Sequence, residues 1–352
     1  MKKIILSFLS LAIVVIACEK DENKPLDTFY QNYYEANILP ALTNFKAQIE
    51  TQIDYTETFQ KDKTLSNLKT LQNQWKITAT NYAKTRVYNF GLVKDNFYDV
   101  KIYNFPVNTT NIETLIQNQD PTILNDLSTK SSTVVGLGTM EYLLFNNQDT
   151  TKALELLEEN SYRTDYLLAV SKEVLNQINA LINFWESGYK TEFSNSSGNN
   201  CLENARCLAF NQIINVLDVN KVTKIGKPAG LEKSDNINPT LLEAYRSQNS
   251  LALIKASLEE VAYVYSGSDI NFASIIDGID SSKKLSKQIS LSFSEVNTNI
   301  EAIKTSLYTA IENEPTKVET LYNSFTTLNN HFSVDGASLL SVTVLPTDND
   351  GD

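Results

Sequence analysis

The sequence predicts an all-α protein built from two helical-bundle halves, each resembling a four-helix bundle, packed together. The 352 residues include only 11 Gly and 8 Pro, the residues that most often interrupt secondary structure. Apolar residues recur at helical spacing, and strand-like alternation is nearly absent. Each predicted helix has one apolar stripe and one polar face, so the stripes must be buried against other helices.

The N-terminus has the pattern of an export signal. Two lysines precede an apolar run, residues 4–16, which is shorter than the roughly 20 residues that span a bilayer. The run ends in Ala17-Cys18, which resembles a lipobox, although an ordinary secretory signal with a chance cysteine has the same appearance. We expect a lipoprotein signal peptide over 1–17, a lipid on Cys18, and a lipidated tether over 18–25.

The tether also bears on location. Residues 19–23, Glu-Lys-Asp-Glu-Asn, resemble the surface-export signal of Bacteroidetes lipoproteins and equally fit a solvated charged linker. The expected location is therefore the outer membrane, facing the periplasm or the cell surface.

The charge balance limits the possible partners. Thirty basic and 42 acidic residues give a formal net charge of −12, which opposes binding to nucleic acid and to bare anionic membranes. Attachment to the membrane would rest on the lipid anchor. An acidic surface attracts cations only weakly and generally. We expect a monomer.

Two cysteines remain besides Cys18, and an exported protein folds in an oxidising compartment. Cys201 and Cys207 are six residues apart, which on a continuous helix is a rise of about 9 Å and a turn of about 240°. A disulfide needs Cα atoms within roughly 7 Å. We expect a disulfide between Cys201 and Cys207, which requires Cys201 to lie in the loop before the helix that carries Cys207.

The helices expected from apolar spacing divide the chain into an N-terminal bundle, 26–190, and a C-terminal bundle, 200–352, separated by the polar run 189–200. The first half is predicted to hold helices over 26–59 (kinked at Pro40), 65–87, parts of 112–127, and 149–185. The second half is predicted to hold helices over 207–222, 238–265, 281–312 and 315–331, with a turn over 224–230 and a short coda over 335–352.

The segment 134–145 is the most informative part of the chain, because a short loop with Gly136 and Gly138 runs into an apolar helix near Glu141. It resembles the signature of the imelysin family, Gly-x-His-x-x-Glu followed by an apolar Phe/Tyr-Leu-Leu-Phe stretch. Residues i and i+3 share a helix face, so a His and a Glu at this spacing could hold one metal ion. Here the histidine position is Gly138, which offers no donor atom.

Four further segments resemble the same family, in the same order along the chain. They are Ile-Tyr-Asn-Phe-Pro-Val-Asn at 102–108, Lys-Ile-Gly-Lys-Pro at 224–228, a Glu-x-x-x-Ser pattern at 243–247, and the tail 339–344 with its closing Asp-Gly-Asp at 350–352. On their order and spacing the chain is identified as a member of the imelysin family.

The resemblance implies an all-helical protein of two bundle-like halves with the signature near a cleft. Members were first described as insulin-cleaving metallopeptidases, and relatives act as periplasmic metal-binding parts of iron uptake systems. We therefore expect a binding component in iron or haem acquisition, with iron or another divalent cation as cofactor and uptake components as partners. The alternatives are a metal-dependent peptidase and a metal-free scaffold for protein interactions.

Glu141 has two interpretations, a metal ligand or a carboxylate in the first turn of a helix, where it would complement the helix dipole and cap free N–H groups. Gly138 could serve a close approach of another element. His331, the only histidine, lies near the end of the last long predicted helix, where a solvated or capping role competes with a ligand role. Zinc catalysis normally uses three protein ligands, whereas hard cations accept oxygen ligands alone. We predict no catalytic residues, because a nucleophilic triad would need His331.

Other charged residues have a functional and a bland interpretation. Asp348, Asp350 and Asp352 could bind calcium weakly or form a frayed acidic terminus. Arg86 and Glu113 are isolated charges near aromatic sequence that could line a pocket or form a half-buried ion pair.

Overall fold

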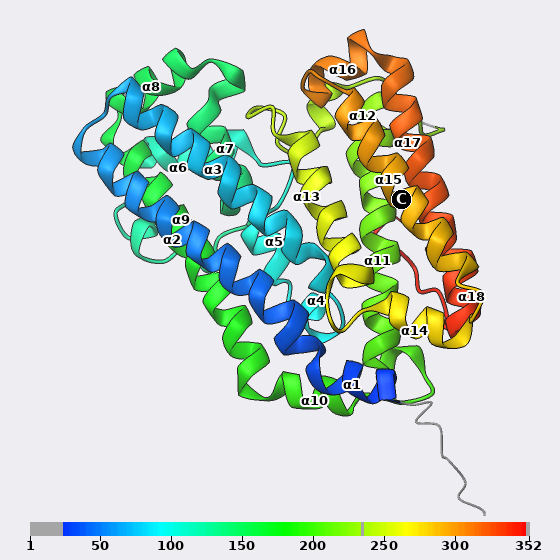
Figure 1. Ribbon diagram of the computed structural model, residues 1–352. Helices are drawn as coiled ribbons and strands as arrows, with labels where there is room; N and C mark the ends of the chain where they lie inside the picture. The colour runs from blue at the N-terminus through cyan, green and yellow to red at the C-terminus, as the bar shows by residue number, and fades with distance from the viewer. Residues whose placement is uncertain (1–23, 234–235, 350–352) are drawn as a thin grey trace, which may run out of the picture.

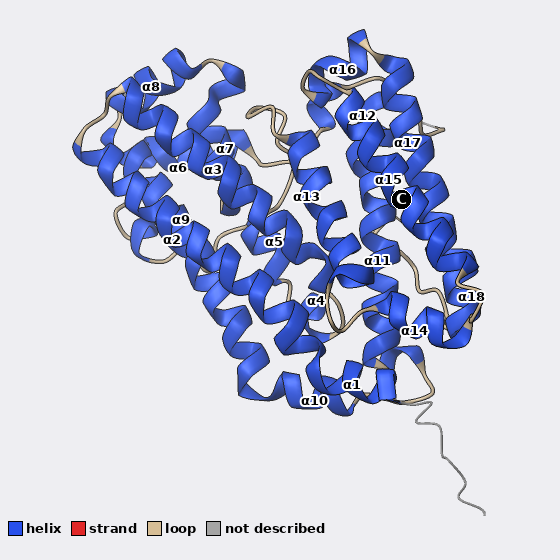
Figure 2. Ribbon diagram, viewed as in Figure 1, coloured by secondary structure: helices blue, strands red, loops and turns tan. Residues whose placement is uncertain are grey.

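In the computed structural model, residues 24–233 and 236–349 are described, and within them the secondary structure is helical, without a named strand (Figure 2). The helices form two side-by-side groups, one running from blue to green and the other from green to red in Figure 1. The predicted all-α class and the bundle-like halves are therefore confirmed.

The first group is built around three long helices. Helix α2 packs against α3 and α9, and α7 lies against both α3 and α9. Its helices are α1 (Lys24–Tyr33), α2 (Leu39–Lys61), α3 (Leu65–Thr85), α4 (Leu92–Asp95), α5 (Tyr98–Ile102), α6 (Thr109–Asn118), α7 (Gly136–Phe145), α8 (Thr150–Glu159), α9 (Ser161–Phe184) and α10 (Lys190–Asn195).

The second group is centred on α11, which packs against α17, while α17 packs against α15. Its helices are α11 (Ala205–Lys221), α12 (Lys227–Ala229), α13 (Ser250–Ala262), α14 (Phe272–Ile279), α15 (Lys284–Ala302), α16 (Leu307–Asn313), α17 (Pro315–Asn330) and α18 (Ala337–Leu340).

The two groups share one continuous apolar core. Helix α13 packs along α3 of the first group, and α1 contacts both α11 and α14 of the second. Aromatic rings join them at α1, where Phe29 lies 5.2 Å from Phe272 between ring centroids. The division into domains at 26–190 and 200–352 stays a prediction, and the junction between these parts is extensively packed.

Two predicted long helices are interrupted, which corrects the spans 149–185 and 281–312. The first divides at Asn160, an extended residue whose side chain accepts a hydrogen bond from the Tyr162 N–H and so begins α9. The second divides between α15 and α16, where the Ser306 side chain caps the new helix through the Thr309 N–H. Asn and Ser compete with the helix for backbone N–H groups, which makes them effective helix starts.

The predicted helix 26–59 is continuous in outline but changes geometry before Pro40. A wider, π-helical turn (Tyr34–Ile38) separates α1 from α2, and Pro40 lies in the first turn of α2. Proline has no N–H to donate to the preceding turn, so this is where the regular bonding of the helix is disturbed.

The predicted helix over 238–265 is wrong in its first half. Only a 3-10 turn (Pro239–Leu241) follows Asn238, Leu242 is extended, and α13 begins at Ser250. Between them Ala244 and Gln248 have positive φ values of 62° and 61°, which a helix excludes. This irregular loop carries much of the candidate site.

A disulfide joins Cys201 to Cys207, with 5.2 Å between their Cα atoms. Cys201 lies in a 3-10 turn just before α11 and Cys207 lies in α11, which is the arrangement that their spacing requires. The signal peptide, Cys18, and the terminal Asp350 and Asp352 lie outside the described residues. The predicted tether, 18–25, stays a prediction, and its last two residues lie at the start of α1.

Within the described part of the chain, none of the helices combines the length and the apolar character that crossing a membrane requires.

Candidate functional site

Most of the family-like segment 134–145 forms α7 (Gly136–Phe145), which is buried on almost every side. The chain enters it through extended Val135 and then Gly136, whose φ is +80°. A Cβ on Gly136 would lie 2.6 Å from the Ile102 carbonyl oxygen. Glycine is required there for both reasons, since other residues pay for a positive φ and none fits so close to a backbone oxygen.

Gly138, at the histidine position of the signature, is covered by the segment 102–107. A Cβ placed on Gly138 would meet the Asn104 carbonyl oxygen at 2.5 Å and Val107 Cγ1 at 2.9 Å. The neighbouring chain thus occupies the space that any side chain would need. Two of the segments that resemble the family pack directly on each other here, and glycine is what permits their contact.

Glu141 lies in the middle of α7 and is fully buried, so its interpretation as a first-turn carboxylate is wrong. Its Oε1 accepts a hydrogen bond from the backbone N–H of Ser247, at 2.8 Å, in the loop before α13. Its Oε2 has no hydrogen-bond partner among the described atoms. Glu141, which lies in the first helical group, therefore accepts a hydrogen bond from a backbone N–H of the second helical group.

The electrostatics of Glu141 are set mainly by its burial. Burial raises the pKa of Glu141 to about 7, against the opposing effects of the Ser247 hydrogen bond and the positive charge of Arg246. Burying a charged carboxylate without a full counter-charge costs free energy, so Glu141 keeps its proton up to about neutral pH.

A second carboxylate, Glu243, lies in the same loop between two cations. Lys224 Nζ lies 2.7 Å from Glu243 Oε2, and Arg86 Nη1 lies 3.8 Å from Oε1. Although burial alone would raise the pKa of Glu243, Lys224 and Arg86 hold it below its usual value. Glu243 is therefore an ionised bridge between the end of α3 and the turn after α11.

Two buried polar side chains beside these acids are incompletely bonded. The guanidinium of Arg246 stacks over the rings of Tyr142 and Tyr245, at 5.3 and 4.5 Å, while its Nε has no hydrogen-bond partner within the described chain. The hydroxyl of Tyr103 is also unpartnered among described atoms. Burial raises the pKa of this phenol well above its usual value, and the charges of Glu243 and Glu141 raise it further. Buried polar groups are normally hydrogen-bonded, so several unpartnered polar atoms close together are unusual.

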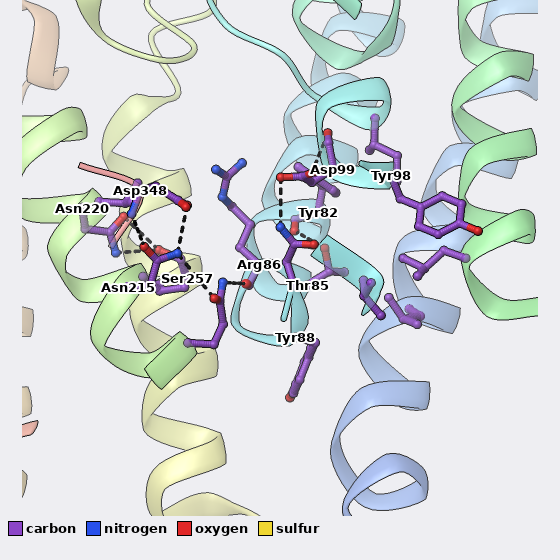
Figure 3. A pocket seen from close by; sticks show the side chains of 18 of the residues that line it. Tyr82, Thr85, Arg86, Tyr88, Tyr98, Asp99, Asn215, Asn220, Ser257 and Asp348 are labelled. Atoms are coloured by element: carbon purple, nitrogen blue, oxygen red, sulfur yellow. Dashed lines mark hydrogen bonds between the residues drawn. The ribbon is translucent and has the colours of Figure 1, made fainter. Parts of the chain in front are cut away.

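A narrow pocket with a cavity volume of about 30 Å³ lies between the two helical groups, and its residues Arg86 and Lys224 both pair with Glu243 (Figure 3). The first group contributes the end of α3, the turn Arg86–Tyr88 and α5, and the second contributes α11, Lys224, Ser257 and the C-terminal tail. Most of this space is too narrow for anything larger than water. The guanidinium of Arg86 projects between Asp348 and Asp99 in Figure 3.

The other predicted candidates are scattered. His331 follows α17 and contacts Asp335 at 2.9 Å, in the other helical group from α7 (Figure 1). Glu113 accepts hydrogen bonds from Arg163 and Tyr142. Glu113 therefore belongs to a half-buried ion pair with Arg163, which is one of the two alternatives that the sequence left open for it.

The two remaining candidates meet at the pocket. Arg86 lines it, and so does Asp348, which is bonded to Asn215 rather than frayed.

Sequence reasoning missed Glu243, Arg246 and Lys224 as site residues. The Glu-x-x-x-Ser pattern at 243–247 and the 224–228 segment were both noted, and they were the signal. Sequence spacing favours a helix and a turn for them, and it does not show that Ser247 and Arg246 contact α7 or that Lys224 pairs with Glu243.

The metal ion that the family implies does not fit these residues. Within 24–233 and 236–349, no three His, Cys, Asp or Glu side chains come together as ligands. Glu141 offers one unpartnered oxygen, Glu243 is bridged by two cations, and Gly138 offers no donor. A metal held by protein ligands alone would need more oxygen or nitrogen donors than this.

Comparisons with known proteins agree with this architecture. The family model described as Imelysin, Peptidase_M75, matches residues 38–331. Among solved structures, the chain is similar to an imelysin-like protein from Psychrobacter arcticum 273-4, with a TM-score of 0.75, 16% identity, and coverage of 92% of this chain and 98% of that one.

A second solved structure is a candidate iron-regulated protein A precursor from Parabacteroides distasonis ATCC 8503. It has a TM-score of 0.75, 16% identity, and coverage of 91% and 96%. No curated protein matches the sequence.

Proposed function

Because the chain belongs to the imelysin family, whose model spans most of it, we propose that it is a ligand-binding protein of the bacterial envelope that works in iron or haem acquisition. One solved structure of the same fold carries the description of an iron-regulated protein, and this supports an iron-related role. The expected partners are iron or haem uptake components.

One observation carries the binding role: the signature helix α7 meets the second helical group through the buried carboxylate of Glu141, and the loop that Glu141 contacts also pairs with residues that line a pocket between the groups. Glu141 accepts a hydrogen bond from Ser247 in the loop before α13, and Glu243 of the same loop pairs with Lys224 and Arg86, which line the pocket. A ligand that enters between the groups would alter contacts on both sides, so its binding and the junction are coupled.

The chemistry of the site favours binding over peptide hydrolysis. A zinc peptidase needs several protein ligands and an open position on the metal. Iron delivered inside a chelate or a porphyrin needs few ligands from the protein. The pocket is narrow, so a ligand of haem size requires movement of the two helical groups.

The location of the protein remains part of the proposal. An outer-membrane lipoprotein with its lipid on Cys18, facing the periplasm or the surface, would keep the binding site near uptake machinery. Acyl chains supply the attachment, since each buried methylene contributes about 0.8 kcal/mol.

The test is direct measurement of ligand binding. The full chain is purified in detergent and titrated with ferric citrate, ferrous iron and haem, following bound metal and tyrosine fluorescence. We expect saturable binding of at least one iron-bearing ligand, weakened at least tenfold in Glu141→Gln. Asp277→Asn is the matched control, because Asp277 is a carboxylate of α14 bonded to Ser286 and Lys283, away from α7.

Two outcomes would overturn the proposal. Failure of the wild-type protein to bind any of these ligands would remove the iron or haem role. Binding that Glu141→Gln leaves unchanged would remove the α7 junction as the site. Cleavage of an unfolded protein substrate only when metal is added would instead favour the peptidase.

A further inference from the structure

We propose that the pocket between the helical groups binds a small carboxylate-bearing anion on the guanidinium of Arg86. This inference names the ligand class of the pocket and therefore rests on the binding function proposed above. The argument has three steps, concerning free donors, competing acids and the positioning of Arg86.

The cations at the pocket have more donors than the acid between them can satisfy. A guanidinium has five N–H donors and an ammonium has three. Glu243 meets Lys224 at 2.7 Å through one oxygen and reaches Arg86 only at 3.8 Å through the other. At that distance Arg86 forms an ion pair without a good hydrogen bond. The planar fork of its guanidinium, meaning the pair of N–H groups that can donate two parallel hydrogen bonds, remains open for a carboxylate.

The two other acids near Arg86 are engaged elsewhere. Asp348 accepts from Asn215 Nδ2 at 2.9 Å through Oδ2, and its Oδ1 contacts Lys94. Asp99 accepts from Asn89 Nδ2 at 2.9 Å. In Figure 3 both carboxylates flank the guanidinium, and no hydrogen bond joins either of them to it.

Arg86 is held in place from both helical groups. Its carbonyl oxygen accepts a hydrogen bond from Gln212 Nε2 of α11, at 2.7 Å, and its guanidinium lies 6.0 Å from the centroid of the Tyr82 ring. A preorganised fork loses little freedom on binding, which favours arginine for planar oxyanions. The narrowness of the pocket restricts the buried group to about the size of a carboxylate or carbonate.

The carboxylate could come from a free small acid or from an iron chelate that carries carboxylates. Binding of formate, acetate, citrate and ferric citrate to the full chain in detergent is measured by calorimetry and thermal unfolding. Sodium chloride at matched ionic strength is the reference. Ferric citrate binding more tightly than citrate would identify the chelate as the source, and equal affinities would identify the free acid.

The variants are Arg86→Gln and Arg86→Lys, with Lys84→Gln as matched control. Lys84 lies two residues away on α3 and pairs with Glu259 outside the pocket, so this variant removes the same charge without touching the fork. We expect at least tenfold weaker carboxylate binding in Arg86→Gln, an intermediate loss in Arg86→Lys, which keeps the charge, and no change in Lys84→Gln.

Absence of carboxylate binding beyond the chloride reference would overturn the inference, as would equal affinity of wild type and Arg86→Lys. Arg86→Lys keeps the ion pair to Glu243, so it serves even where Arg86→Gln does not fold. Acetate binding without any iron or haem binding would leave this inference standing and remove the iron role. Iron or haem binding that ignores Arg86 would do the reverse.

Discussion

Glu141 should give the stability of the protein a visible pH dependence. Its pKa is about 7 in the folded protein because of burial, against an ordinary value of 4.5. A carboxyl with a raised folded pKa binds its proton more tightly in the folded state, so its stabilising contribution is fully present below pH 4.5. That contribution is lost as pH rises from 4.5 through 7.

The loss should reach about 3 kcal/mol of unfolding free energy, since each pKa unit corresponds to about 1.4 kcal/mol. Urea unfolding of wild type and Glu141→Gln from pH 4.5 to 8 measures it as the difference between two curves. Glutamine keeps an acceptor for the Ser247 N–H and has no titration, so stability of the variant should decline less. Parallel curves would mean that Glu141 does not titrate in this range.

At the same scale, the sequence identified Glu141, Gly136 and Gly138 but not their roles. A motif specifies residue types and spacing along one helix. The environment of Glu141 comes from Ser247 and Arg246, more than 100 positions away. No local pattern records that the partner of a carboxylate is a backbone N–H in another helical group.

At the scale of elements, the packing of the segment 102–107 on α7 depends on Gly138. The variant Gly138→Ala should destabilise the protein by about 1–3 kcal/mol, the usual cost of overpacking, because the new Cβ meets the backbone oxygen of Asn104. Gly138→His should cost more.

Gly278 provides the matched control, because it lies in α14 with nothing within 4 Å of an added Cβ. There alanine should be neutral or stabilise by up to about 1 kcal/mol through helix propensity. The measurement compares the unfolding midpoints of Gly138→Ala and Gly278→Ala in the same denaturant series, and we expect a lower midpoint for Gly138→Ala. Equal midpoints for both would show that the segment 102–107 moves aside without cost.

Element boundaries were predictable where local chemistry fixes them. Helix α3 and helix α17 follow from apolar spacing with a capping Thr64 and an initial Pro315. The loop over 242–249 was not predictable, because its apolar residues also fit helical spacing. The positive φ of Ala244 and Gln248 is imposed by tertiary contacts, which outweigh local propensity.

At the scale of the whole molecule, periodicity shows which face of a helix is buried but not against which partner. The apolar stripe of α13 predicts burial equally well within its own half. The structure instead packs α13 along α3 of the other half. This long-range choice creates the junction, the pocket and the neighbourhood of Glu141, so the site could be predicted only in part.

The C-terminal tail also joins distant parts of the molecule, and this contact can be tested. The side chain of Asn211 on α11 both donates to and accepts from the tail backbone. Its Nδ2 donates to the Thr343 carbonyl at 3.0 Å, and its Oδ1 accepts from the Leu345 N–H at 2.7 Å. One turn further along α11, Asn215 holds Asp348 at the edge of the pocket. The tail is therefore held along α11 by side-chain hydrogen bonds from Asn211 and Asn215.

Replacing Asn211 by Ala removes two hydrogen bonds to the tail and one to the Cys207 carbonyl, and should lower the unfolding free energy by about 3 kcal/mol, at about 1 kcal/mol each. Hydrogen exchange should accelerate most at residues 342–349, because two of these hydrogen bonds hold the tail. Asn323→Ala, at an exposed position of α17, is the matched control and should change stability by less than about 0.5 kcal/mol. Unchanged exchange across 342–349 in Asn211→Ala would mean that the tail is held by its remaining contacts alone.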